Sequence, residues 1–213
     1  EALAASGSFT ARQAILAVPL GILQSNRILI TPRPDTTLAA AAKLRMGNAH
    51  RFTLLFRNRF WASLAPQPTL AELSFLFAFD QMPPVWWTPH PEHSNSITGW
   101  VGGPRSAALE ALDTSELGHE ACITLARIFG LNADHLQQQL IACYTHDWQN
   151  DPFALGAYSY VAAGGLNASR QMTEPLARTL YFAGEHTDVT GHWGTVHAAI
   201  SSGLRAAAQI LGT

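Results

Sequence analysis

Gly184 and Glu185 directly follow a short apolar stretch, residues 179–183, that reads as a strand. A loop rich in His, Thr and Gly comes next, and from Thr195 the sequence predicts a helix that runs to Leu211. The first amides of such a helix have no partner within it and carry partial positive charge, so they attract electron-rich groups. A strand, an acidic turn, a glycine loop and an open helix start together suit the negatively polarised edge of a cofactor. Alone, the pattern is only moderately specific, since any strand–helix unit supplies half of it.

The predicted helix carries apolar residues on one face. They recur three or four positions apart, which is the spacing of a 3.6-residue period. The small residues among them would let the helix approach a sheet or a ligand closely. The pattern therefore predicts a packed face made of Val196, Ala199, Ile200, Gly203, Leu204, Ala207 and Leu211.

Other reactive side chains form no recognisable site. The chain has nine histidines, but residues 90–93 (HPEH) lie in a Pro/Ser loop without the spacing of metal ligands, so we expect no metal. Cys122 and Cys143 lack a CxxC arrangement and read as two buried free thiols. Neither a Ser-His-Asp triad nor a pair of carboxylates is apparent.

The composition excludes several function classes. Hydrophobic residues make up 47% of the 213 residues and charged residues only 13%, against the roughly 25% charged that is usual. A net charge of -2 with scattered basic residues argues against a nucleic-acid-binding face. The longest uncharged stretch, residues 152–169, contains Pro, Gly and Asn and does not read as a membrane span. We expect a soluble, cytoplasmic protein; a homo-oligomer is left open.

Strands in the middle of the chain alternate with helices at both ends, which predicts a fold of mixed α/β and α+β class. The first strand is apolar enough to be buried, and Pro19 ends it. The expected strands are 14–18, 52–56, 73–79, 85–88, 97–101 and 179–183, and the expected helices are 35–46, 106–112, 114–129 and 195–211.

The sequence resembles a known family in four segments that follow one another in order. Residues 182–207, with FAGEHT and GTVHAAISSGLRAA, resemble the C-terminal flavin motif of flavin-dependent amine oxidases, in particular of the polyamine oxidase and lysine-specific demethylase branch. The other matching segments are 14–21 (AILAVPLG), 44–48 (LRMGN) with Phe60-Trp61, and 148–152 (WQNDP) with 156–160 (GAYSY).

The resemblance implies the C-terminal part of a two-domain, FAD-linked amine oxidase fold. Residues 1–31 and 151–213 would belong to the Rossmann-like FAD-binding domain, and residues 32–150 would form the substrate-binding domain of mixed sheet and helices. The implied reaction is oxidation of a C–N bond in a small-molecule amine by hydride transfer to the flavin, with O2 as the acceptor that reoxidises it.

The resemblance also implies roles for single residues. Tyr158 and Thr195 match the two walls of the amine site, and Arg51 stands where the family often has a lysine near the flavin. These three are the expected catalytic residues. The residues expected to bind the cofactor are Val18, Pro19, Trp148, Gly184, Glu185, Gly194, Thr195 and Val196.

Two departures from the family matter. The fingerprint GxGxxG, which binds the ADP part of FAD, is absent from the sequence. We therefore expect an N-terminal half to supply it and this chain alone to be incomplete and inactive. An arginine at position 51 leaves open whether O2 is the acceptor. Alternatives are a related desaturase or protoporphyrinogen-oxidase-like flavoprotein, or an interaction domain without cofactor; GAYSY and TVHA favour the amine oxidase. The identity of the amine stays open.

Overall fold

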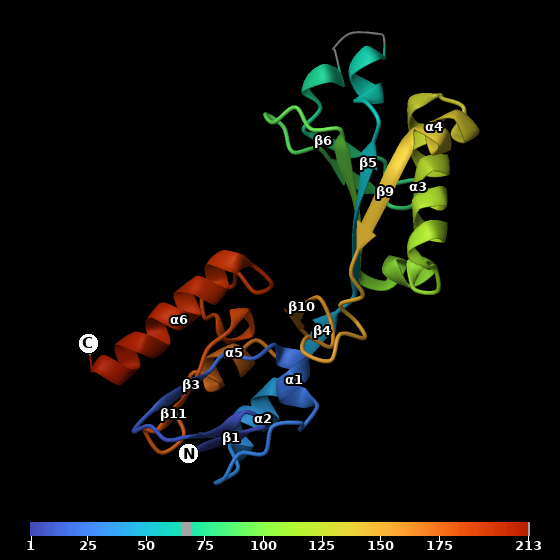
Figure 1. Ribbon diagram of the computed structural model, residues 1–213. Coiled ribbons are helices and arrows are strands. Elements are labelled where there is room, and N and C mark those ends of the chain that lie inside the picture. The colour runs from blue at the N-terminus through green and yellow to red at the C-terminus, as the bar shows by residue number, and fades with distance from the viewer. Residues whose placement is uncertain (65–69, 213) are drawn as a thin grey trace. The chain divides into compact units, whose positions relative to one another are not determined.

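The computed structural model describes residues 1–64 and 70–212 (Figure 1). The chain folds into two compact units, of which unit 1 comprises Glu1–Gly47 with Trp148–Thr213 and unit 2 comprises Asn48–Asp147. The sequence places the boundaries at 31/32 and 150/151 instead. Helices and strands are mixed in both units, which agrees with the predicted fold class.

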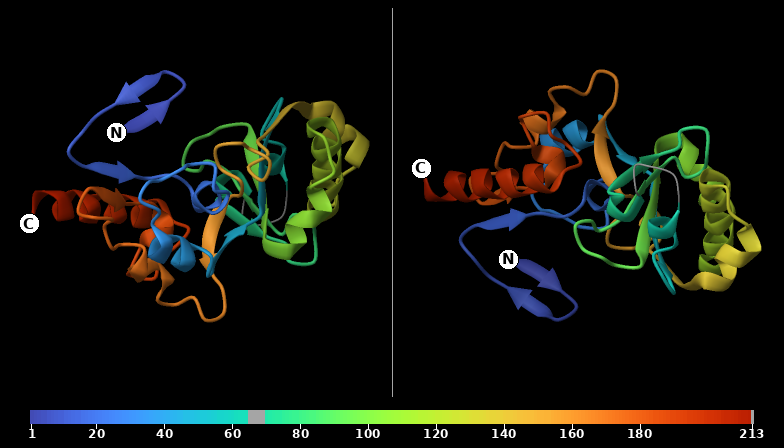
Figure 2. Two further views of the ribbon diagram at one scale, coloured as in Figure 1. Left: turned by 90° about the horizontal axis from the view of Figure 1, so that it is seen from below. Right: turned by 90° about the horizontal axis from the view of Figure 1, so that it is seen from above.

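Unit 1 contains three small sheets within the described residues. Strands β1 and β2 form an antiparallel hairpin (Figure 2), β4 and β10 pair antiparallel, and β3 and β11 pair parallel. Its elements are β1 (Ala2–Ala4), β2 (Gly7–Phe9), β3 (Ala14–Leu16), α1 (Leu20–Gln24), α2 (Asp35–Ala41), β4 (Leu44–Gly47), β10 (Tyr158–Val161), α5 (Ala168–Gln171), β11 (Leu180–Phe182), the 3₁₀ turn η4 (Glu185–Thr187) and α6 (Val196–Leu211).

The prediction of one helix over 35–46 is wrong in its second half. Helix α2 ends at Ala41, and Leu44–Gly47 forms β4, in which Met46 lies opposite Ser159 and Gly47 opposite Tyr158. Ala and Leu favour a helix locally, but pairing with a distant strand outweighs that preference.

The expected buried strand over 14–18 is shorter and more exposed than predicted. Only Ala14–Leu16 are extended as β3, and the Ile15 side chain is 42% exposed. The reason is that β3 has β11 as its one strand neighbour in the described part of the chain.

Helix α6 has the predicted length but packs through a different face. Ala198, Ser202 and Ala206, four residues apart, are buried, whereas Val196 is 77% and Leu204 68% exposed. Small side chains on the inner face bring the helix close to β11 and η4, where the Ser202 hydroxyl accepts a hydrogen bond from the Gly184 amide at 2.9 Å. The predicted apolar face therefore points outward in this chain.

Unit 2 is a five-stranded antiparallel sheet in the order β6-β7-β8-β5-β9 with α3 packed on one side. Its elements are β5 (Ala49–Phe56), η1 (Phe60–Ser63), η2 (Leu70–Glu72), β6 (Phe75–Phe77), β7 (Val85–Trp87), β8 (Ser96–Gly102), the 3₁₀ helix η3 (Gly103–Leu109), α3 (Thr114–Phe129), α4 (Ala133–Gln139) and β9 (Leu140–Thr145).

The core of unit 2 lies between α3 and one face of this sheet. Phe52, Trp86 and Leu125 are each 0–1% exposed, and the rings of Phe52 and Trp86 meet edge-on with centroids 5.7 Å apart. Gly99 lies opposite both rings, because a Cβ there would come within 2.7 Å of the Phe52 ring. One sheet face is thus closely packed around an obligatory glycine.

Helix α3 spans the predicted residues 114–129. The Asp113 side chain accepts from the amides of Ser115 and Glu116, the Glu116 side chain accepts from the Asp113 amide, and Gly130 ends the helix at φ 66°. The predicted helix over 106–112 is instead the 3₁₀ segment η3, and α4 and β9 were not predicted. None of the helices among the described residues has both the length and the apolarity needed to cross a bilayer.

Candidate functional site

Glu185 ties three segments of unit 1 together. Its Oε1 accepts a hydrogen bond from the Ser159 amide at 2.9 Å, and its Oε2 accepts from the Ser159 hydroxyl at 2.6 Å and from the Gly194 amide at 2.7 Å. The carboxylate therefore links η4, strand β10 and the loop before α6. Hydrogen bonds to an ionised acceptor are stronger than neutral ones, so this one side chain fixes the local geometry.

The Tyr158 ring lies against the glycine that precedes α6. A Cβ at Gly194 would come within 3.1 Å of the Tyr158 ring, and Gly194 has a φ of 74°, so both space and conformation favour glycine. Burial raises the pKa of the Tyr158 hydroxyl above its ordinary value, so the hydroxyl is protonated at neutral pH, as an unshifted tyrosine would also be. The fold thus brings together four residues singled out in the sequence: Tyr158, Glu185, Gly194 and Thr195.

Thr195 caps α6 and leaves two amides open. Its hydroxyl accepts from the Ala198 amide at 3.3 Å and donates to the His192 carbonyl at 2.6 Å. The Val196 and His197 amides have no hydrogen-bond acceptor within the described residues. These two N–H groups, at the positive end of a sixteen-residue helix, can receive an electron-rich group.

The loop between η4 and α6 is organised by Asp188, which is not among the site residues predicted from the sequence. Its carboxylate accepts from the amides of Thr190 and His192 and from the Thr190 hydroxyl. Burial alone would raise the pKa of Asp188, but these hydrogen bonds outweigh it and lower that pKa. The spacing of Asp188 and Thr190 is typical of a side chain that organises its own turn, a signal that was available in the sequence.

His186 is buried next to Glu185 in the chain, and Arg205 joins three elements of unit 1. Burial lowers the pKa of His186 to about 4, against the raising effect of Glu185, and Arg205 adds to the lowering, so the imidazole is neutral at pH 7. Arg205 donates to the Phe182 carbonyl at 2.8 Å and to the Thr187 hydroxyl at 2.9 Å, which joins α6 to β11 and η4. Neither residue was selected from the sequence, since their partners depend on the fold.

The remaining expected cofactor residues lie elsewhere in unit 1. Val18 packs against the core cluster that contains Leu20 and Leu44, and Pro19 precedes α1. Trp148 is 45% exposed, and its carbonyl accepts from the Gly156 amide at 2.8 Å. Gly184 has a φ of 127° and lies over the His186 ring.

Arg51 belongs to unit 2, on strand β5. It is exposed, and its guanidinium lies over the Trp87 ring, 5.8 Å from the centroid. In residues 1–64 and 70–212 its side chain takes part in no ion pair. Arg51 is therefore an uncompensated cation on an aromatic surface.

Comparison with known proteins identifies the family. The model of the family "Flavin containing amine oxidoreductase" matches residues 2–211, nearly the whole chain. The chain belongs to this family. The resemblance inferred from the sequence is thereby confirmed, and FAD is the cofactor that family membership implies.

The chain is also similar to individual curated proteins and solved structures. The chain is 29% identical to "Lysine-specific histone demethylase 1 homolog 2" of Arabidopsis thaliana, over 99% of this chain and 28% of that protein. It is 28% identical to "Probable polyamine oxidase 5" of the same species, over 92% of this chain and 45% of that protein. A solved putrescine oxidase with bound putrescine shares the fold, with a TM-score of 0.76 at 21% identity over 94% of this chain and 43% of that one. The chain thus spans less than half the length of these relatives.

Proposed function

We propose that this chain supplies the flavin-facing and amine-facing part of an FAD-dependent amine oxidase, which oxidises a C–N bond by hydride transfer with O2 as the acceptor. The observation that carries the proposal is the Glu185 carboxylate, which holds the Tyr158–Ser159 strand against the Gly194–Thr195 helix start. An aromatic side chain and a set of open amides are thereby fixed in one place.

The residues around the α6 start fit the electron-rich edge of a flavin. The Val196 and His197 amides are open, and the glycine at 194 lets the Tyr158 ring lie next to the helix start. An anion at a helix N-terminus is stabilised by about 0.3–1 kcal/mol when exposed and by up to about 2 kcal/mol when partly buried. When bound, FAD supplies the hydride acceptor. The residues expected to hold it are Gly184, Gly194, Thr195 and Val196, with Val18, Pro19 and Trp148 as further neighbours.

In this role Glu185 is a positioning residue. Both of its carboxylate oxygens are engaged by protein donors, so its effect on a cofactor would pass through Ser159 and Gly194. The expectation that Glu185 binds the cofactor thus becomes a proposal that it holds the residues that do.

Tyr158 and Thr195 would form the walls of the amine site. The Tyr158 hydroxyl stays protonated and its ring presents an electron-rich face, which orients an alkylammonium group. Thr195 is small and its hydroxyl is engaged with the His192 carbonyl, so the wall it forms is short and open. Arg51 lies in unit 2, and its expected catalytic role stays a separate prediction.

We further propose that the ADP part of FAD is bound by an N-terminal half outside this chain, because the sequence has no GxGxxG. The outward apolar residues of α6 support this, as does the edge of β3 that pairs with no strand of the described residues, since parallel sheets are normally covered on both faces. Val196, Ile200, Leu204 and Ile15 would then be covered in the complete enzyme.

Tyr158→Ala tests the amine site. In FAD-loaded enzyme containing this chain, the substitution should slow anaerobic flavin reduction by an amine roughly tenfold, because cation–π orientation contributes about 0.5–2 kcal/mol. The FAD content should stay unchanged. Tyr160→Ala, on the same strand and 51% exposed, is the matched control. Equal reduction rates in the two variants would remove Tyr158 from the site.

A further inference from the structure

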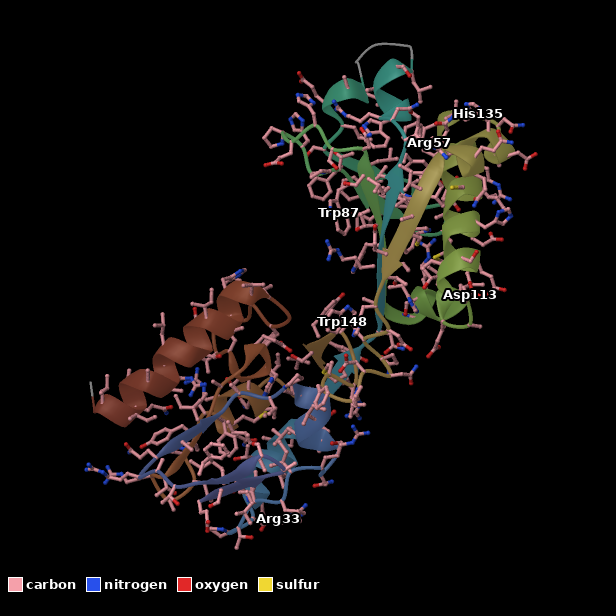
Figure 3. The ribbon with its side chains drawn as sticks, viewed as in Figure 1. Arg33, Arg57, Trp87, Asp113, His135 and Trp148 are labelled. Atoms are coloured by element: carbon pink, nitrogen blue, oxygen red, sulfur yellow. The ribbon has the colours of Figure 1, made fainter. Side chains whose placement is uncertain are left out.

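The sheet of unit 2 has a second face that α3 does not cover. Cross-strand pairing puts Phe75 opposite Trp87, Arg51 opposite Trp100 and Thr53 opposite Tyr144, all on this side. We define Arg51, Phe75, Phe77, Trp87, Trp100 and Tyr144 as the open face. Figure 3 shows Trp87 on the side of the sheet away from α3.

The open face is unusually aromatic for an exposed surface. Phe75 is 60%, Phe77 59% and Tyr144 61% exposed, while residues of the opposite face such as Phe52 and Ile97 are 0–1% exposed. The rings of Phe75 and Phe77 stack with centroids 6.2 Å apart, and Phe75 lies equally far from Trp87. Clustered exposed aromatic side chains mark a binding surface more often than an ordinary one.

The charge of the open face is a single uncompensated cation. The Arg51 guanidinium lies over the Trp87 ring, with its Cζ 5.8 Å from the centroid, and no carboxylate of the described residues pairs with it. The strand positions that pair across this face, in β5 to β9, include no Asp or Glu. A planar guanidinium binds a carboxylate through two parallel hydrogen bonds.

We propose that the open face binds a ligand that combines an aromatic ring with a carboxylate, the chemistry shared by aromatic amino acids and arylacetates. The ring would lie among Phe75, Phe77 and Trp87, and the carboxylate would pair with Arg51. A polycation is disfavoured, because it would meet a like charge and no carboxylate. The proposal rests on the proposed function in that it takes unit 2 as the substrate-binding part.

Direct binding to the 213-residue chain tests the proposal without flavin or turnover. The probes are phenylacetate, phenethylamine and spermidine, each titrated calorimetrically. Phenylacetate should bind, phenethylamine should bind roughly tenfold or more weakly because it lacks the carboxylate, and spermidine should not bind. Absence of phenylacetate binding, or tighter binding of spermidine, would overturn the proposal.

Variants locate the binding on the open face. Arg51→Gln should weaken phenylacetate binding roughly 10- to 100-fold, and Arg51→Glu should reverse the preference towards phenethylamine. Arg127→Gln, an exposed arginine on α3 at the other side of the sheet, makes the same charge change and should have no effect. Phe75→Ser, at an exposed position, should also weaken binding. Equal effects of Arg51→Gln and Arg127→Gln would contradict the assignment.

Two other outcomes are distinguishable. If a second copy of the chain covers the open face, sedimentation will show a dimer that Phe77→Ser dissociates and phenylacetate will not bind, which overturns the proposal. If phenylacetate binds as described but FAD-loaded enzyme oxidises no amine, the ligand site stands and the proposed function fails.

Discussion

Glu185→Gln should destabilise unit 1, because an amide cannot replace a carboxylate that accepts three hydrogen bonds. The donors are the Ser159 amide at 2.9 Å, the Ser159 hydroxyl at 2.6 Å and the Gly194 amide at 2.7 Å. Glutamine has one acceptor oxygen. If that oxygen keeps the two bonds at the Oε2 position, the NH2 group faces the Ser159 amide, donor against donor.

The expected loss follows from these contacts. An unpaired Ser159 amide costs about 1–3 kcal/mol, since the residue is 3% exposed. The two remaining bonds lose their charge assistance, which removes about half of their strength. Together the free energy of unfolding of unit 1 should fall by about 2–4 kcal/mol.

Urea unfolding and amide hydrogen exchange measure this effect. The Ser159 and Gly194 amides should exchange at least about tenfold faster in the variant, because their shared acceptor is weakened. Glu174→Gln is the matched control. Glu174 is an exposed glutamate of the same unit, and its side chain takes no part in the hydrogen bonds of the Glu185 carboxylate. If both variants unfold at the same urea concentration and exchange alike, the role assigned to Glu185 is refuted.

Three further predictions concern stability, measured by urea unfolding. The pKa of His186 is about 4 in the folded chain and 6.5 in the unfolded chain, so between these pH values only the unfolded chain binds a proton at His186. The contribution of His186 to the free energy of unfolding should therefore be constant above pH 6.5. It should fall by about 3 kcal/mol as the pH is lowered towards 4. His186→Gln should flatten that slope, and an unchanged slope would contradict the assignment. Gly21→Ala should lower the free energy of unfolding by about 1–3 kcal/mol, because the new Cβ would lie 2.7 Å from the Ala154 and Leu155 carbonyl oxygens. Gly203→Ala, where the space is open, should raise the free energy of unfolding by about 0.5–1 kcal/mol. Equal effects of the two substitutions would contradict the packing described for Gly21. Asp188→Asn should lower the free energy of unfolding by about 1–3 kcal/mol, because hydrogen bonds to the Thr190 and His192 amides are weakened. An unchanged free energy of unfolding would show that the loop does not depend on the carboxylate.

Elements with clear end signals could be predicted from the sequence. Helix α3 begins at a capping box and ends at Gly130, and α6 begins at the capping Thr195, so both agree with expectation within a residue. Residues 44–47 could not be identified as a strand, because only pairing with β10 makes them one.

The burial of side chains was harder to predict than the secondary structure. The apolar pattern of α6 selects Val196 and Leu204, yet the face packed in this chain is built from small residues such as Ser202. Periodicity shows which residues share a face but not which neighbour covers it. Likewise, the apolar stretch around Ile15 predicts a buried strand, but it does not show which neighbour would cover Ile15.

The candidate site could be predicted in part. Motif residues located Tyr158, Glu185 and the α6 start, which the fold brings together. Arg205 was missed, because the importance of a buried polar residue depends on partners that only the tertiary structure supplies. Asp188 was missed although its partners, Thr190 and His192, lie within four residues of it in the sequence.

Reconstitution with FAD tests whether this chain completes a flavin site. The 213-residue chain is mixed with FAD and with a separately produced N-terminal half that carries the GxGxxG segment, and the visible absorbance of the flavin is followed on anaerobic addition of an amine. We expect no tight FAD binding by the chain alone, stoichiometric binding by the mixture, and bleaching by the amine that O2 reverses. Tight FAD binding by the chain alone, or a yellow mixture that no amine reduces, would contradict this expectation.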